Sequence, residues 1–461
     1  MLFNSLLFLV FFIIITTGYY LIPHKLRWAW ILAASCYFYM YFKPVYILII
    51  LFTIVIDYVA GILIENSSGK KRKIYLLLSL IANIGVLAFY KYFDFLAQNL
   101  NIVLSAGQLP QIPLLNILLP IGLSFHTFQA MSYTIEVYRG NQKAEKHFGI
   151  YSLYVLFYPQ MVAGPIERPQ HILPQLHRVN DFLSKNIISG LFIITIGLFK
   201  KVVIADHLGL FVDPAFSNPH AHTSIELIFA TYLFAFQIYC DFSGYSDMAI
   251  GTALVLGIQL MRNFNSPYLS TSISEFWKRW HISLSTWFRD YLYIPLGGNR
   301  KGFLLTCLNL FIVFLVSGLW HGADWKYLIW GALHGLFLIV NQITKKFGIE
   351  LKGYSWLKWL ATFNLICLAW IFFRASSVED ALYIISRIFN FEFQKPEFLY
   401  LYSRDILFCV ILIFTLLCFE LYFRNKAPLN ASKKIFFSIL LLFSCYFFGI
   451  FNEEQFIYFQ F

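Results

Sequence analysis

A histidine set between two apolar stretches is the first residue of this sequence that could do chemistry. His321 stands between Trp320 and Gly322, and Asp324 follows three residues later. A lone histidine at such a place is usually a hydrogen-bonded structural residue. Glycines that allow close backbone approach, and an imidazole that exchanges protons near neutral pH, favour a catalytic base. The sequence does not show whether Asp324 contacts His321.

A second polar group lies in residues 263–300, where aromatic and basic residues alternate. It contains Trp280, His281 and Arg289. Alternation of this kind predicts an amphipathic helix at the cytoplasmic interface of a membrane. For His281, a structural role at that interface and a role in substrate positioning are both open.

A third polar group directly follows an apolar stretch and contains Asp241, Ser243, Tyr245 and Asp247. The two aspartates could orient a histidine or pair with lysine or arginine. A solvated helix end, with aspartate as the cap of the next segment, is the alternative. We favour structural support of a site over direct chemistry.

Two further groups interrupt apolar stretches with proline and glycine. Residues 119–129 contain His126, which could hydrogen-bond a neighbouring helix or take part in catalysis, with equal support for each. Residues 158–168 contain Gln160 and predict a re-entrant turn, because irregular backbone is tolerated where protein or water covers it.

The elements that must position these residues are membrane helices. The chain has 461 residues, of which 59% are hydrophobic and 13% charged, and the mean hydropathy is +0.66. Soluble domains have about a quarter of their residues charged. We expect an all-α polytopic protein with about 11 to 13 spans plus re-entrant and interfacial helices, in one membrane-embedded domain over 1–461 with its core motif region at 120–334. The expected spans are 3–22, 28–43, 45–64, 74–95, 114–136, 187–205, 224–240, 303–320, 325–342, 356–374, 404–423 and 435–452, with shorter re-entrant or tilted runs at 148–164 and 248–260.

Basic residues predict the orientation, since they concentrate in cytoplasmic loops. The segments 24–27, 70–73 and 139–146 are basic and follow the first, third and fifth expected spans. The N-terminus is therefore expected outside, as are residues 452–454 with the C-terminus. The pair Lys200 and Lys201 fits less well, because it lies late in a span expected to run outward, so that region is expected to be bent or buried. The first run, 1–22, lacks a basic leader and a cleavage site and is expected to be a retained span.

Several functional classes find little support. The seven cysteines form no C-x-x-C pair, which argues against a zinc site. The net charge of +11 comes from basic residues that lie between the expected spans and not in a stripe on a soluble domain, so nucleic acid is not an expected partner. The sequence lacks the G-x-S-x-G motif that would indicate a serine hydrolase. We see no repeat of matched halves, which weakens a transporter interpretation.

Taken together, the polar motifs resemble the membrane-bound O-acyltransferase family, particularly its bacterial branch of alginate O-acetylation proteins. D-alanyl transfer proteins of teichoic acid synthesis are more distantly similar. Each motif alone is weak, and the resemblance depends on their order and spacing over Pro120 to His334. The motifs are Pro159-Gln160 with Ala163-Gly164-Pro165-Ile166, Asp241 to Asp247, Phe276-Trp277 with Arg279-Trp280-His281, and Trp320-His321-Gly322.

The resemblance implies an all-helical enzyme with a thinned centre and a tunnel from a cytoplasmic donor to an acceptor on the other side. His321 would be catalytic, and His281 would assist. The supporting or substrate-binding positions would be His126, Gln160, Asp241, Ser243, Tyr245, Asp247, Trp280, Arg289, Trp320 and Asp324. No bound cofactor or metal is implied.

The resemblance also implies a setting, namely a multi-pass protein of the bacterial cytoplasmic (inner) membrane. The donor would be acetyl-CoA or an acyl-carrier thioester, and the acceptor an exported polysaccharide of the alginate or peptidoglycan type. An extracytoplasmic acetyltransferase would be the partner. The alternatives are D-alanyl transfer from a carrier protein and a membrane transporter, in which polar residues would line a permeation path.

Overall fold

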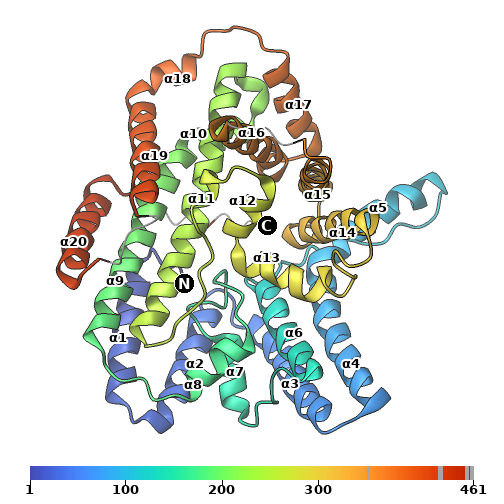
Figure 1. Ribbon diagram of the computed structural model, residues 1–461, viewed down its shortest axis with the longest axis vertical. Helices are drawn as coiled ribbons and strands as arrows, with labels where there is room; N and C mark the ends of the chain where they lie inside the picture. The colour runs from blue at the N-terminus through green and yellow to red at the C-terminus, as the bar shows by residue number, and fades with distance from the viewer. Residues whose placement is uncertain (350–353, 424–428, 452–455, 457–461) are drawn as a thin grey trace. The chain divides into compact units, whose positions relative to one another are not determined.

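The computed structural model describes residues 1–349, 354–423, 429–451 and 456, and in these ranges all regular secondary structure is helical. The α-helices are α1 (Leu6–Leu21), α2 (His24–Met40), α3 (Tyr46–Glu65), α4 (Gly69–Leu87), α5 (Phe93–Ala106), α6 (Leu123–Arg139), α7 (Phe148–Leu156), α8 (Pro169–His177), α9 (Ser184–Phe199), α10 (Asp206–Ser217), α11 (Ser224–Val255), α12 (Ile273–Arg279), α13 (Ile282–Phe288), α14 (Phe303–His321), α15 (Trp325–Lys346), α16 (Ser355–Arg374), α17 (Val378–Phe389), α18 (Glu397–Leu401), α19 (Ser403–Phe423) and α20 (Ala431–Phe448) (Figure 1). Shorter π-helical or 3-10 segments are η1 (Ala88–Tyr92), η2 (Lys200–Ala205), η3 (Pro219–Ala221), η4 (Pro267–Leu269) and η5 (Arg289–Tyr293). The expected external residues 452–454 lie outside the described ranges.

The chain forms a polytopic membrane protein. Nine helices of the described ranges are long and apolar enough to cross a membrane. Side chains on α20 such as Ile439, Phe443 and Phe447 are each more than half exposed, which suits contact with lipid rather than water. The all-α membrane fold is thus confirmed. Three expected spans correspond to shorter helices of 16 or 17 residues, namely α1, α2 and α6, and of these only α1 is comparably apolar.

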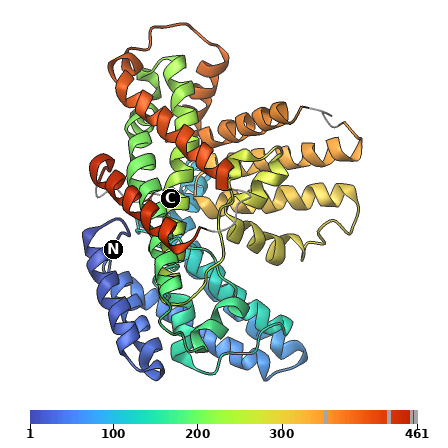
Figure 2. The ribbon, with the colours of Figure 1, turned by 60° about the vertical axis from the view of Figure 1, so that its left-hand side comes forward.

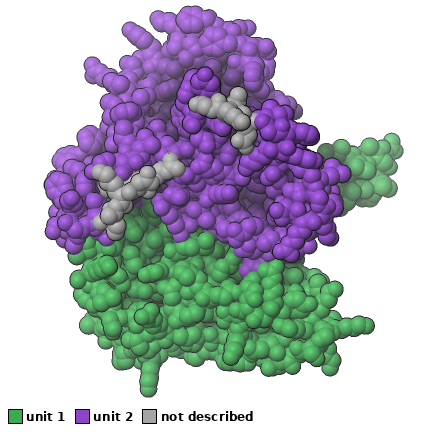
Figure 3. All heavy atoms as spheres, in the orientation of Figure 1, with its two compact units in different colours: residues 1–194, 246–261 green, residues 195–245, 262–461 purple. Residues whose placement is uncertain are grey.

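Two compact units make up the chain (Figure 3). The first contains residues 1–194 and 246–261, and the second contains residues 195–245 and 262–461. One domain over the whole chain stays a prediction.

Buried polar contacts hold the helices of the first unit together. Asp57 on α3 accepts hydrogen bonds from Ser79 (2.6 Å) and Asn83 (2.9 Å) on α4. Thr53 on α3 is hydrogen-bonded to Nε2 of His126 on α6, at 2.6 Å. Such contacts satisfy polar groups that no water reaches in a membrane interior.

Several expected boundaries were wrong. The stretch expected at 114–136 becomes helical only at Leu123, because Gly122 adopts φ +77° immediately before it. The stretch 224–240 and the first part of 248–260, up to Val255, belong to the single 32-residue helix α11, so the third polar group lies inside a helix and not at its end. Polar residues of the third group, such as Asp241, have buried partners, so the helix can continue through them.

The expected single amphipathic helix within 263–300 was also wrong. The structure has α12, α13 and η5 in its place, separated at Trp280 and His281. Trp280 is extended and His281 has φ +43°, a left-handed conformation that cannot continue a helix. The break turns both side chains inward.

Candidate active site

His321 is the last residue of α14, at the turn into α15. The next residue, Gly322, has extended backbone and ends the helix. A Cβ atom on Gly322 would lie 2.0 Å from the ring of Tyr327, so no larger residue fits there without movement. The tight turn fixes where the His321 side chain begins.

Aromatic rings surround the His321 imidazole, which is only 5% exposed. The centroids of the Trp320 and Trp330 rings each lie 4.9 Å from that of His321, and the centroid of Phe373 lies 5.3 Å away. Rings on three sides restrict the imidazole to few orientations and exclude bulk water. A histidine held in this way can exchange a proton at a fixed position.

Close packing of α14 against α15 supports this arrangement, and the two helices lie side by side (Figure 2). A Cβ on Gly318 of α14 would lie 2.2 Å from the carbonyl oxygen of Tyr327. A Cβ on Gly331 of α15 would lie 2.3 Å from the carbonyl oxygen of Phe314. Glycine at both positions therefore lets the backbones approach closely.

Replacing Gly331 with alanine is expected to force the two helices apart and destabilise the protein by about 1–3 kcal/mol. The position of the His321 ring should be disturbed with it, since Trp330 contacts that ring. Gly85→Ala is the control, because a Cβ on this helical glycine meets nothing within 4 Å. Unfolding in detergent, followed by tryptophan fluorescence, checks the result. Equal stability of the two variants would contradict the packing argument.

Asn263 positions the turn at His281. Its backbone carbonyl accepts a hydrogen bond from the Ile282 amide at 2.9 Å. Its side-chain oxygen accepts from the amide (3.2 Å) and the hydroxyl (3.0 Å) of Ser283. These three bonds hold the chain just after His281 and stabilise its left-handed conformation.

His281 is fully buried and lies beside the same tryptophan as His321. The centroid of its ring is 6.3 Å from Trp320 and 4.7 Å from Phe242. Trp320 is thus a shared neighbour of both histidines. Burial lowers the pKa of His281 to about 3, so its ring is neutral at physiological pH and can donate from one nitrogen and accept at the other.

The third polar group contributes a buried ion pair. Lys201 lies 2.7 Å from Asp241 and 2.8 Å from Asp206, measured from Nζ to Oδ1. The region around Lys200 and Lys201 was expected to be bent or buried, and Lys201 is buried in the π-helical segment η2. In the same group, Ser243 is buried and Tyr245 packs on Phe456 with ring centroids 4.7 Å apart.

Three other expected site residues have structural contacts. Asp324 caps α15 by accepting a hydrogen bond from the Lys326 amide at 2.9 Å. No hydrogen bond joins Asp324 to His321 in the described ranges. Trp280 is buried among aromatic rings, and its ring centroid lies 5.1 Å from that of Trp370. Arg289 is largely exposed and pairs with Asp290, which raises its pKa.

The remaining expected residues belong to the first unit. His126 makes the bond to Thr53 described above. Gln160 is buried in the turn after α7 and donates to the carbonyl oxygen of Tyr154 at 3.1 Å. At nine residues, α7 is too short to cross a membrane. Asp247 lies on the part of α11 that falls in this unit.

Sequence reasoning missed His334 as a site residue. It is fully buried on α15, and its Nδ1 accepts a hydrogen bond from the indole N–H of Trp277 at 3.3 Å. Its ring centroid lies 4.8 Å from Trp330, which also contacts His321. A histidine inside an apolar span was the available signal.

A cavity of about 450 Å³ opens in the second unit beside α14. Ser317 lines it and lies four residues before His321, on the same face of the helix. Apolar side chains, including Val313 and Phe314, form most of the wall, and Lys278 and Arg289 add positive charge. The cavity suits a long, mainly apolar ligand with an anionic end. In the described ranges, no group of three or more metal-ligating side chains comes together.

Known proteins match most of this chain. The model of the membrane-bound O-acyltransferase family matches residues 142–379. A peptidoglycan O-acetyltransferase of Helicobacter pylori is 40% identical over 387 residues, which are 77% of this chain and 72% of that protein. A Pseudomonas putida protein named "probable alginate O-acetylase AlgI" is 37% identical over 440 residues, 93% of this chain and 89% of that protein.

A more distant match is a teichoic acid D-alanyltransferase of Bacillus subtilis. It is 26% identical over 282 residues, which are 57% of this chain and 71% of that protein. The residues matched by the family model include both His281 and His321.

Proposed function

Since the chain belongs to the membrane-bound O-acyltransferase family, we propose that it passes acetyl groups from a cytoplasmic thioester to hydroxyls of an exported polysaccharide. The observation that carries this proposal is His321 in its aromatic pocket, with Trp320 shared by His281. The named activities of the two more similar relatives favour an acceptor of the peptidoglycan or alginate type.

In the proposed reaction, His321 removes the proton from the acceptor hydroxyl. The hydroxyl oxygen then attacks the thioester carbonyl carbon and forms a tetrahedral intermediate. When the carbon–sulfur bond breaks, the thiolate leaves and takes the proton back from His321, so the enzyme is unchanged at the end. A base held near the reacting hydroxyl is what this step requires.

His281 is better suited to hydrogen bonding than to proton abstraction. Its neutral ring, with a pKa lowered by burial, is a weak base. An N–H group at this position can donate to the oxyanion of the intermediate or hold the acceptor. We therefore assign His321 the proton transfer and His281 the positioning of reacting groups.

The cavity beside Ser317 is the proposed place of the thioester donor. Ser317→Phe would fill it and is expected to raise the KM for acetyl-CoA about tenfold or more, by removing space for the ligand. Val316→Phe is the matched control, because the neighbouring Val316 is 38% exposed on the same helix. Initial rates at varied donor concentration would measure both. The same KM in both variants would place the donor elsewhere.

Membership of this family makes the protein an acyltransferase and argues against the transporter alternative. D-alanyl transfer remains the second candidate, because a D-alanyltransferase is a more distant relative. Purified protein in nanodiscs would be offered labelled acetyl-CoA or a D-alanyl carrier thioester, with peptidoglycan or alginate fragments as acceptors. Label from acetyl-CoA in a fragment supports the proposal, and label from the D-alanyl carrier alone overturns it.

We further propose that the N- and C-termini face outward in a bacterial inner membrane, as the basic segments indicate. A separate extracytoplasmic acetyltransferase would complete transfer to the polymer. Label that reaches fragments with this protein alone, but reaches intact polymer only when such a partner is added, would support that division of labour.

A further inference from the structure

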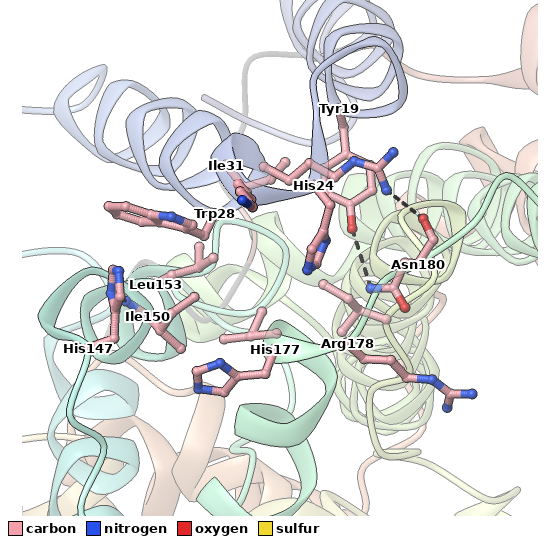
Figure 4. A pocket seen from close by; sticks show the side chains of 14 residues that line it. Tyr19, His24, Trp28, Ile31, His147, Ile150, Leu153, His177, Arg178 and Asn180 are labelled. Atoms are coloured by element: carbon pink, nitrogen blue, oxygen red, sulfur yellow. Dashed lines mark hydrogen bonds between the residues drawn. The ribbon is translucent and has the colours of Figure 1, made fainter.

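A cavity of about 260 Å³ lies in the first unit, at the junction of α1 and α2 and beside α7 and α8. Figure 4 shows the side chains that line it. Three histidines and three permanent cations line it, namely His24, His147, His177, Lys25, Arg27 and Arg178. No carboxylate is among the described residues of its lining. The cavity is therefore strongly electropositive and suits an anion.

One wall of the cavity is fixed by Arg27. Its guanidinium donates to the carbonyl oxygens of Ile22 (3.1 Å) and Asn180 (2.6 Å) and lies 4.9 Å from the Tyr19 ring centroid. Asn180 in turn donates to the Tyr19 hydroxyl at 3.3 Å. Figure 4 shows the two bonds made by Asn180, which join α1 and α2 to the segment after α8. The positive wall is thus built in advance of any ligand.

Two other cations are available to a ligand. Lys25 and Arg178 are exposed, and neither has an ion-pair partner in the described ranges. The nearby carboxylate of Glu145 is already paired with Nε2 of His177, at 2.7 Å. An incoming anion would therefore meet two flexible cations at the cavity mouth.

Apolar side chains around the cavity indicate which anion it takes. Trp28, Ile150 and Leu153 line it beside the charges. Leu21 and Phe182, at the ends of the neighbouring segments, are 79% and 64% exposed. A soluble phosphate needs no such apolar surface, whereas a lipid needs it for its acyl chains. Basic pockets at the ends of membrane helices are suited to anionic lipid headgroups.

We propose that this cavity binds the headgroup phosphodiester of an anionic phospholipid. The phosphate contacts Lys25 and Arg178 against the fixed Arg27, and the acyl chains lie along the exposed apolar residues. This site is independent of the acyl donor and of the catalytic histidines. The inference stands on the cavity and does not depend on the proposed acceptor or donor.

The test uses the full-length protein in nanodiscs of phosphatidylcholine with added phosphatidylglycerol. Native mass spectrometry after release counts the phosphatidylglycerol molecules that stay bound. The variant Lys25→Ala/Arg178→Ala should bind phosphatidylglycerol about tenfold or more weakly than the unmodified protein, since two phosphate contacts are lost. Lys70→Ala/Lys71→Ala is the control. It removes two exposed lysines of another basic segment that does not line the cavity.

Weaker binding in the first variant alone supports the site. Equal loss in both variants would show general attraction to the basic surface, and no loss would show that lipid binds elsewhere, so either result overturns the proposal. Inorganic phosphate and coenzyme A are added as competitors. If either displaces phosphatidylglycerol at equal concentration, the cavity binds a soluble phosphate and the lipid assignment is wrong. The charge-reversal variant Lys25→Glu/Arg178→Glu should bind no phosphatidylglycerol and gives a second check.

Discussion

Acyl transfer is expected to fall about 10²- to 10⁴-fold when His321 is replaced by alanine, the range typical for loss of a general base. The acceptor hydroxyl would then have no group to take its proton, while the cavity beside Ser317, where we propose that the donor binds, would be unchanged. We therefore expect the loss in kcat, with a KM for the donor that changes little. Single-turnover transfer of labelled acetyl groups, measured in nanodiscs, would check both.

The control for His321→Ala is His220→Ala. His220 is exposed and packs on Tyr383, with ring centroids 3.9 Å apart, so its loss removes an imidazole without touching the site. Both variants must elute from size exclusion like the unmodified protein. Equal activity of the folded His321→Ala variant and the control would rule out His321 as the base. His281→Ala should leave more activity than His321→Ala, because positioning can be partly replaced by water.

Several residues of the candidate site could be singled out from the sequence because charged and polar groups are energetically costly inside a membrane. His321, His281 and Asp241 each interrupt an apolar pattern, and all three turned out to be buried. Hydropathy also gave the all-α fold and most of the spans. The polar residues and the spans could be predicted because each depends on the solvation of a single segment, which can be read from its own residues.

Contacts between distant segments were not predictable in this way. The partner of Asp241 is Lys201, 40 residues earlier, and no local pattern pairs them. The left-handed turn at His281 depends on Asn263, 18 residues before it. Whether Asp324 contacts His321, three residues before it, was left open by the sequence, and in the structure Asp324 caps α15. Tertiary packing decided each of these.

The buried charge cluster of Lys201, Asp206 and Asp241 is expected to have a large effect on the stability of the protein and not on the reaction. Removing the Lys201 amine is expected to destabilise the protein by about 3–5 kcal/mol, because Asp241 and Asp206 would keep buried negative charges without their cation. The loss should appear as unfolding at lower concentrations of denaturing detergent in Lys201→Met. Lys200→Met is the matched control. Lys200 is the adjacent residue, and its Nζ lies 5.7 Å from the Tyr239 ring centroid. Its replacement should lower the free energy of unfolding by less than Lys201→Met does.

A triple variant separates the charge from the packing. Lys201→Met combined with Asp206→Asn and Asp241→Asn carries no unpaired charge at this position, so it should recover at least half of the stability lost in Lys201→Met. Recovery would show that the cost lies in the unpaired carboxylates. If the triple variant were as unstable as Lys201→Met, the lysine would act through the shape of η2, and the ion cluster would not be the cause. Either variant that stays folded should keep a measurable rate of acyl transfer, because the cluster supports the helices and the proton transfer is proposed for His321.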